Sequence, residues 1–527
     1  MGDLVFNFIL FVLIYLIGFL SISGFGKLFV DKNNLNYNKG NFFDLQIFGT
    51  IILLVSSYLI YVTIGTNHFI NIFILFFGVI IYFFYKKDLN RVKLIHLIGL
   101  LIIILPILLI SKTHEDFNTY HYFSIYEVFN NNLRIGVYNL NDRFFHSSHL
   151  IHNQSLYVFP YLNLKMIHLP VIYIYVSTIG YFLFLCFLNK NSEEVLFSIF
   201  CLLILLIKFN RLSEFGYDYI AQFLLLIAFH KIYFLINNDD EVIISIIFLL
   251  LSVLVKPISL LFIPLFFYVL VNKKYSFYKY LIKSRFLIIS SLILILISSS
   301  FFKTGCFFYP INFTCFNKEQ ISWSEKEKIK DYSSMVRLWA KAYYTQKDSK
   351  YEKIEDESLF SKNFNWLKYW IEKHFFYKLF EFLIIVILSF LISYIYFTKH
   401  KSNVANKINK KLIFLGLSLL SILFWLVTVP QFRFGFAAII IFSFIFLRIF
   451  LNKDIIFTKK KFFTLILIGL LVLNIKSIIR INSEFERNDF YTFTNFPYFN
   501  EIKIINNYKN IERSNFLHIE ILNKKIF

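Results

Sequence analysis

Repeated apolar runs divide the chain, and most of them are long enough to cross a bilayer as a helix. The hydrocarbon core of a bilayer is about 30 Å thick, so a spanning helix needs roughly 17 to 25 mostly apolar residues. Backbone polar groups cannot stay unpaired in lipid, which makes helix the expected form of each run. We predict an all-α polytopic transmembrane protein with about fourteen transmembrane helices, at residues 4–23, 45–64, 69–85, 93–111, 167–188, 194–208, 218–236, 242–255, 258–271, 286–302, 378–397, 411–429, 434–451 and 462–480.

Composition agrees with a membrane protein and argues against a nucleic-acid-binding one. The chain is 57% hydrophobic and 17% charged, whereas soluble domains are about 25% charged. The formal net charge of +21 could suit nucleic acid, but Lys and Arg gather in short loops between apolar runs. Basic loops of this kind orient membrane proteins. We therefore expect membrane lipid around the chain and no nucleic acid as a partner.

The same basic loops predict the orientation of the chain, because loops rich in Lys and Arg stay in the cytoplasm. The loops expected there are 24–44, 86–93, 272–285, 399–411 and 448–461. The two large loops, 112–165 and 303–377, then lie outside the membrane, together with both termini, and the first apolar run is retained as an anchor. Cys306 and Cys315 share the second loop, so they could form a disulfide if it faces an oxidising compartment.

A polar stretch directly after an apolar run is the first candidate site. It reads HEDFNTYHY and contains His114, Glu115, Asp116 and His121. A partly desolvated carboxylate at a membrane boundary can have the pKa that a general base needs. The alternative is an interfacial acid that only helps to end the helix. The neighbouring imidazoles favour the catalytic interpretation.

Three histidines follow in the run HSSHLIH. His146, His149 and His152 lie at steps of three, which puts them on one side of a helix if the segment is helical. Three imidazoles can bind a transition metal, but neither an HExxH motif nor a cysteine partner is present. We favour polar groups that line a cleft over metal ligands.

Two cations lie at predicted outward helix ends. Lys256 precedes Pro257 in VKPISLLFIP, where proline either kinks one helix or separates two. Arg433 follows a tight turn in VPQFRFG. Each either snorkels to the interface or holds an anionic group such as phosphate. Asp218 lies in a third outward loop with Arg211 and Glu214, where a mutual salt bridge is the simplest interpretation.

The order of these motifs resembles the GT-C superfamily of membrane glycosyltransferases. HEDFNTYHY, GVYNLNDRFFHSS, TGCFFYP followed by FTCF, and VPQFRFG are similar to a group of bacterial membrane proteins linked to surface-polysaccharide synthesis. The resemblance covers about residues 93–450. This chain differs in carrying three apolar runs before the shared module and HED in place of paired aspartates.

The resemblance also implies a division of the chain into regions. These are an N-terminal three-helix extension, a GT-C-like module with its first outer loop, a large extracytoplasmic loop, C-terminal helices and an extracytoplasmic tail, at residues 1–92, 93–302, 303–377, 378–480 and 481–527.

The resemblance implies sugar transfer from a polyprenyl-phosphate-linked donor to a glycan acceptor at the outer face of a bacterial plasma membrane. Asp116 or Glu115 would act as the base, and Lys256 and Arg433 would hold the donor phosphate. We assign the other polar residues of these motifs to substrate binding: His114, His121, Asp142 and Arg143. No cofactor is assigned, and a requirement for a divalent cation stays open. The alternatives are an O-antigen polymerase or ligase, and a transporter or flippase of lipid-linked sugars.

Overall fold

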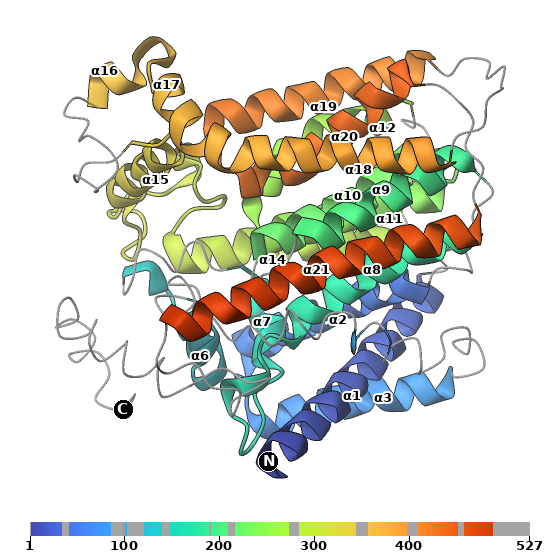
Figure 1. Ribbon diagram of the computed structural model, residues 1–527. Coiled ribbons are helices and arrows are strands. Elements are labelled where there is room, and N and C mark those ends of the chain that lie inside the picture. The colour runs from blue at the N-terminus through green and yellow to red at the C-terminus, as the bar shows by residue number, and fades with distance from the viewer. Residues whose placement is uncertain are drawn as a thin grey trace.

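The structure is a bundle of long helices with shorter elements gathered at one end (Figure 1). This computed structural model describes residues 2–33, 42–85, 99, 101–102, 121–139, 148–188, 191–208, 217–272, 284–343, 357–397, 408–451 and 458–487. Within these ranges the regular elements are helical, and the described residues form no β-strand.

The helices follow the apolar runs of the sequence. The first half contains α1 (Gly2–Lys32), α2 (Phe42–Thr63), α3 (His68–Phe84), α6 (Tyr122–Asn130), α7 (Leu150–Ser155), α8 (Leu169–Leu188), α9 (Ser192–Lys208), α10 (Tyr217–Leu235) and α11 (Asp239–Val255). The second half contains α12 (Ile263–Asn272), α14 (Ser284–Thr304), α15 (Lys326–Ala340), α16 (Glu357–Ser361), α17 (Trp366–Trp370), α18 (Phe380–Phe397), α19 (Ile408–Thr428), α20 (Phe432–Phe450) and α21 (Lys459–Arg487). A π-helical segment, Ile371–Leu379, joins α17 to α18. Short 3₁₀ segments lie at Val137–Asn139, Leu164–Met166, Pro257–Phe262, Asn312–Thr314 and Lys362–Phe364.

The chain is a polytopic helical membrane protein. In its described part, nine helices are long and apolar enough to cross a membrane, and two shorter apolar helices accompany them, His68–Phe84 and Pro257–Phe266. Each predicted apolar run lies in a helical part of the structure except 93–111, of which only residues 99, 101 and 102 are described. The total of about fourteen spans therefore stays a prediction.

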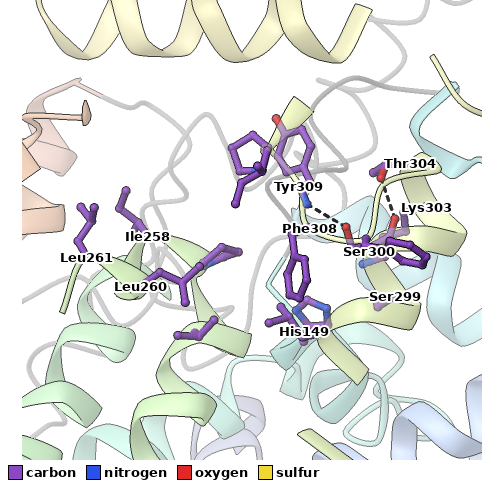
Figure 2. A pocket seen from close by; sticks show the side chains of 16 residues that line it. His149, Ile258, Leu260, Leu261, Ser299, Ser300, Lys303, Thr304, Phe308 and Tyr309 are labelled. Carbon is purple, nitrogen blue, oxygen red and sulfur yellow. Dashed lines mark hydrogen bonds between the residues drawn. The ribbon is translucent and has the colours of Figure 1, made fainter. Parts of the chain in front are cut away.

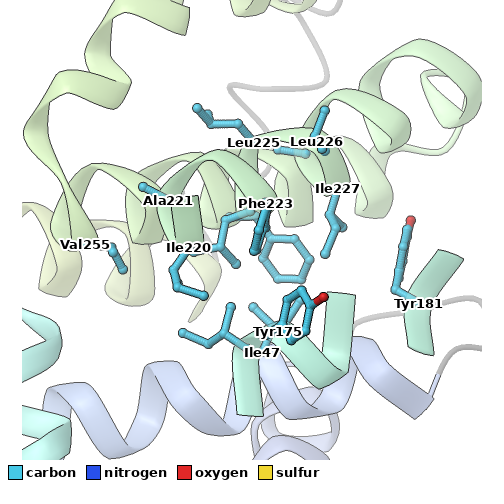
Figure 3. Packing of buried hydrophobic residues seen from close by; sticks show 14 of the residues in the cluster. Ile47, Tyr175, Tyr181, Ile220, Ala221, Phe223, Leu225, Leu226, Ile227 and Val255 are labelled. Atoms are coloured by element: carbon cyan, nitrogen blue, oxygen red, sulfur yellow. The ribbon is translucent and has the colours of Figure 1, made fainter. Parts of the chain in front are cut away.

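The centre of the bundle is formed by α8 and α10. Each span has a most apolar stretch, and the buried share of that stretch differs between helices. It is 89% in the span that contains α8 and 78% in α10, but only 17% in α14 and 28% in α21. A helix that is apolar all round and buried belongs to the core, whereas an apolar and exposed one suits lipid contact. Figure 3 shows the packing at this centre, where Phe223 of α10 faces Tyr175 of α8 with ring centroids 5.7 Å apart.

Backbone contacts bind the first three helices together. A Cβ atom at Gly49 of α2 would lie 1.9 Å from the carbonyl oxygen of Ile22 in α1, and one at Gly24 of α1 would lie 2.1 Å from the carbonyl oxygen of Gly78 in α3. Only glycine permits such close approach, which is the usual basis of tight helix pairs in membranes. Because α2 also contacts α7 and α8, the N-terminal helices pack directly on the rest of the bundle.

A cluster of ion pairs lies near the C-terminal end of α10. Lys231 Nζ lies 2.9 Å from Asp44 Oδ2 of α2 and 2.7 Å from Glu241 Oε2 of α11, and the three side chains are buried. Lys231 follows Asp218 by 13 residues, or about 20 Å of helix. Asp218 and Lys231 thus mark two ends of the bundle, which we call the Asp218 end and the Lys231 end.

The second large loop has a small core of its own at the Asp218 end. Cys306 and Cys315 form a disulfide, and they cluster with Tyr138 and with Ile329 of α15. Ile329 is fully buried there. α15 therefore packs on the core of this loop. Tyr138 belongs to the first large loop, so the two loops meet in this core.

Two local predictions are settled by the backbone. Pro257 separates two helices, since α11 ends at Val255, Lys256 is extended and a 3₁₀ turn precedes α12. The run HSSHLIH does not form one helix through all three histidines. His149 only caps α7, His152 lies inside it, and His146 lies outside the described residues.

α21 also continues to Arg487, beyond the predicted end near residue 480, because RINSEFER contains no Gly or Pro to stop it.

Candidate functional site

Asp218 is the centre of a charged cluster at one end of the bundle. It occupies the first turn of α10, where an acid is favoured by the positive end of the helix dipole. Lys256 Nζ lies 3.0 Å from its Oδ1 atom, and Arg433 Nε lies 3.1 Å from its Oδ2 atom. One carboxylate thus pairs with two cations from different helices.

Lys256 reaches Asp218 because the chain breaks at Pro257. Pro257 has no amide hydrogen and cannot continue α11, so the helix ends at Val255. Lys256 adopts an extended conformation as the C-cap, with φ −152° and ψ 114°. The lysine that the sequence marked as either snorkelling or anion-binding therefore already holds an anionic group of this chain.

Arg433 is positioned by a turn that two tryptophans fix. The indole nitrogen of Trp370 donates to the carbonyl of Pro430 at 2.7 Å, and that of Trp425 donates to the carbonyl of Gln431 at 2.8 Å. α20 begins one residue later, at Phe432. The guanidinium also lies 5.8 Å from the ring centre of Trp339, in the last turn of α15. The second large loop thus contributes an aromatic wall to the cluster.

The charges of the cluster are unequal and differ in exposure. Two cations face one carboxylate, so the three side chains carry a formal charge of +1. The Asp218 and Lys256 side chains are 13% and 15% exposed, whereas Arg433 is 34% exposed. An arginine fork offers five donors, so its exposed edge suits a phosphate or a second carboxylate.

His121 approaches the same cluster through Tyr217. Its ring lies 4.7 Å from that of Tyr217 in an edge-on arrangement, and Tyr217 directly precedes Asp218. The hydroxyl of Tyr217 donates to the side-chain oxygen of Gln154 in α7. His121 also interacts electrostatically with Asp218. The beginning of α6 therefore meets the beginning of α10 at the charged cluster.

A cavity of about 160 Å³ lies between the 3₁₀ turn Pro257–Phe262 and α14 (Figure 2). Pro257, the residue after Lys256, forms part of its wall. α14 contributes Ser299 and Lys303, and the segment after it contributes Phe308. His149 closes the polar side. The cavity is mainly apolar with a few polar groups, as is usual for small-molecule sites.

His149 is a neutral, hydrogen-bonded side chain in this wall. Its Nδ1 atom lies 2.9 Å from the carbonyl oxygen of Leu254, and its backbone amide donates to the same oxygen at 3.1 Å. Burial and the positive charge of Lys303 lower the pKa of His149 to about 3, although the Leu254 carbonyl acts in the opposite direction. His149 therefore lines a cleft, as the sequence analysis favoured.

His152 is part of the core. It is fully buried between Tyr58 and Tyr61 of α2, with ring centroids 5.1 Å away in both cases. Burial is the main reason that its pKa lies well below the ordinary value. Among the described residues, no group of three His, Cys, Asp or Glu side chains could hold a metal ion.

The structure brings together three of the predicted substrate-binding residues: His121, Lys256 and Arg433. The remaining candidates lie outside the described residues, namely His114, Glu115, Asp116, Asp142, Arg143 and His146. Their roles stay predictions.

Sequence reasoning missed Asp218 as a member of the site. The prediction for Asp218 was a salt bridge within its own loop, where Arg211 supplies the positive charge, and Arg211 and Glu214 lie outside the described residues. The structure instead pairs Asp218 with Lys256 and Arg433. An acid in the first turn of a span is common for helix-dipole reasons alone. The signal that could have indicated the cluster is that the sequence places an acid and two cations each at a predicted outward helix end.

Comparison with known families places the chain. The family model described as Domain of unknown function (DUF8201) matches residues 6–440. The chain belongs to this family. The matched region starts in α1 and includes Asp218, Lys256 and Arg433. No curated protein and no solved structure matches the chain.

Proposed function

We propose that this protein is a membrane glycosyltransferase. It moves a sugar from a polyprenyl-phosphate-linked donor to a cell-envelope glycan or lipid acceptor at the outer face of a bacterial plasma membrane. The observation that carries the proposal is that Lys256 and Arg433, the two cations to which the GT-C resemblance gives the donor phosphate, meet on Asp218.

The chemistry of transfer explains the need for such a cluster. The acceptor hydroxyl attacks the anomeric carbon of the donor sugar, a new C–O bond forms, and the bond from that carbon to the phosphate oxygen breaks. The phosphate leaves with the bonding electrons, so cations near it stabilise the transition state. A carboxylate takes the proton of the acceptor hydroxyl. In our proposal this carboxylate is Asp116, with Glu115 as the alternative.

Asp218 has a positioning role in this scheme. Two cations that face each other without an anion would repel, and Asp218 keeps Lys256 and Arg433 close before the donor arrives. The exposed edge of Arg433 meets the donor phosphate first. The phosphate then shares the two cations with Asp218, or displaces its carboxylate from one of them.

The disulfide supports the proposed side of the membrane. Disulfides persist in oxidising compartments such as the bacterial periplasm and the cell exterior. Cys306 and Cys315 lie in a loop whose α15 reaches Arg433 through Trp339. The disulfide and the charged cluster therefore share the Asp218 end, which we assign to the outer face.

Transport is the rival that is not an enzyme activity, and the buried charges bear on it. A transporter is expected to carry ionisable groups near the membrane midplane. The most deeply buried ion pairs, Asp44–Lys231–Glu241 and His230–Glu194, lie near helix ends, since Asp44, Glu194 and Glu241 are each the third residue of a helix. This placement suits a structural clamp better than a substrate path through the membrane.

The test is a transfer assay in membranes that hold the full chain and a polyprenyl-phosphate-linked radiolabelled sugar. We expect a new glycosidic product, and we expect Asp116→Asn to abolish it while the protein level is unchanged. Labelled lipid that crosses the membrane without a new glycosidic bond would refute transfer and indicate a flippase. Products that grow by whole repeat units would identify a polymerase instead.

A further inference from the structure

The cavity between the 3₁₀ turn Pro257–Phe262 and α14 has the size of one six-membered ring. Its volume is about 160 Å³, close to that of an engineered cavity of about 150 Å³ that binds benzene. A long hydrocarbon chain does not fit inside it. A single sugar ring does, with its substituents directed toward the opening.

One wall of this cavity offers a hydrogen-bond acceptor. The Leu254 carbonyl can only accept, so Nδ1 of His149 must carry the hydrogen and Nε2 must carry the lone pair. His149 is 7% exposed, and its Nε2 atom has no hydrogen-bond partner among the described residues. A buried polar atom without a partner is costly unless a ligand or water satisfies it.

Ser299 adds a second polar group to the same cavity. Its side chain is 2% exposed, and its hydroxyl likewise has no partner within the part of the chain that the structure describes. Figure 2 shows Ser299 on α14 and His149 near each other at the polar side. A hydroxyl both donates and accepts. The two groups together suit a ligand with neighbouring hydroxyls.

Two further parts of the lining are apolar or aromatic and suit the carbon faces of a ring. Phe308 and Tyr309 stand over the cavity, and Leu260 and Leu261 face them from the other side (Figure 2). Leu260 is 36% exposed, so the apolar side is open at the surface of the bundle. The lining contains no acidic residue and no cysteine, which removes the ligands that most metals require.

We propose that this cavity binds one hexose ring, with a ring hydroxyl donating to Nε2 of His149 and a second hydroxyl paired with Ser299. The choice of a sugar over another hydroxylated ring rests on the proposed function. Pro257, which directly follows Lys256 in the chain, forms part of the wall, so the cavity and the charged cluster share one segment of the backbone. The cavity thus adds a sugar subsite to the charged cluster.

The experiment measures binding without turnover. The full chain is placed in lipid nanodiscs, and saturable binding of tritiated hexyl β-glucoside is measured after subtraction of empty nanodiscs. Unlabelled cyclohexyl hexyl ether serves as a competitor, because it keeps the ring and tail but has no hydroxyls. We expect saturable glucoside binding and about tenfold weaker competition by the ether, because the ether leaves the buried polar groups of the cavity unpaired.

His149→Phe should weaken glucoside binding about tenfold, because it keeps an aromatic ring and removes the acceptor. The matched control is His168→Phe, which changes another buried histidine that packs on Phe11 and does not line the cavity. Ser299→Ala is the second variant in case His149→Phe does not fold. Equal binding by the wild type and a folded cavity variant, or equal competition by the ether, would overturn the proposal.

The two proposals can fail separately. Glucoside binding that depends on His149, together with no glycosidic product in the transfer assay, would refute the enzyme and leave the sugar site. A glycosidic product without His149-dependent binding would refute the sugar site and leave the enzyme.

Discussion

Asp218→Asn is the most informative perturbation, because within the described residues Asp218 is the anion that pairs with both Lys256 after α11 and Arg433 of α20. The variant keeps the size of the side chain and one carbonyl oxygen, but leaves Lys256 and Arg433 without their shared charge. It therefore isolates the electrostatic role of Asp218 from its packing.

The magnitude follows from contact and exposure. Loss of a charged hydrogen-bond partner costs about 1.5 to 3 kcal/mol, and breaking a fully buried ion pair costs about 3 to 5 kcal/mol. Arg433 is 34% exposed, so solvent screening reduces its share. We expect Asp218→Asn to lower the free energy of unfolding by about 2 kcal/mol.

The measurement is unfolding of the purified protein in mixed micelles, with Asp31→Asn as the matched control. Asp31 forms an i,i+4 pair with Lys27 at 2.7 Å, and such pairs are worth only about 0.3 to 0.5 kcal/mol. A double-mutant cycle with Lys256→Met should give a coupling energy of about 1 to 2 kcal/mol. Equal losses for Asp218→Asn and Asp31→Asn, or a coupling energy near zero, would refute the cluster as a structural unit.

Two further predictions concern neighbouring groups. The pKa of His149 is about 3 in the fold and has an ordinary value of 6.5, so the unfolded chain binds more protons between these values. Its contribution to stability is complete above pH 6.5 and is lost as the pH falls toward 3, by at most about 1.4 kcal/mol per pH unit. His149→Phe should flatten this part of an unfolding profile, and an unchanged acid slope would contradict a neutral His149. The second prediction concerns Cys306→Ser, which removes a disulfide between cysteines that are 9 positions apart in the sequence. Its loss should destabilise the loop core by about 2 to 3 kcal/mol. Hydrogen exchange at Ile329 reports the loss, and full reaction of unreduced wild-type Cys306 and Cys315 with a membrane-impermeant thiol reagent would contradict the disulfide.

Local sequence patterns were sufficient to predict most of the helices. The break at Pro257 follows from a missing amide hydrogen, and the start of α20 follows from the turn at Pro430. α8 carries no charged residue, which agrees with its burial at the centre of the bundle. These features depend on residues that are close in sequence, so they can be predicted from the sequence.

Contacts between helices could not be predicted in the same way. The sequence places Lys256 and Arg433 each at a predicted outward helix end, but only packing of α10 between α11 and α20 reveals Asp218 as their common partner. The spacing of the histidines did not predict where the helix begins. Because α7 starts at Leu150, His149 turns to the carbonyl of Leu254 and lines the cavity, while His152 enters the core.

Donor dependence of sugar transfer by Arg433→Ala tests the central claim most directly. Arg448→Ala is the matched control, since Arg448 lies 15 residues further along α20 and pairs with Glu193 near the Lys231 end. The account predicts that Arg433→Ala raises the KM for the polyprenyl-phosphate donor at least tenfold. Folded Arg448→Ala should have the same donor KM as the wild type. An unchanged donor KM in folded Arg433→Ala would contradict a phosphate site at this cluster.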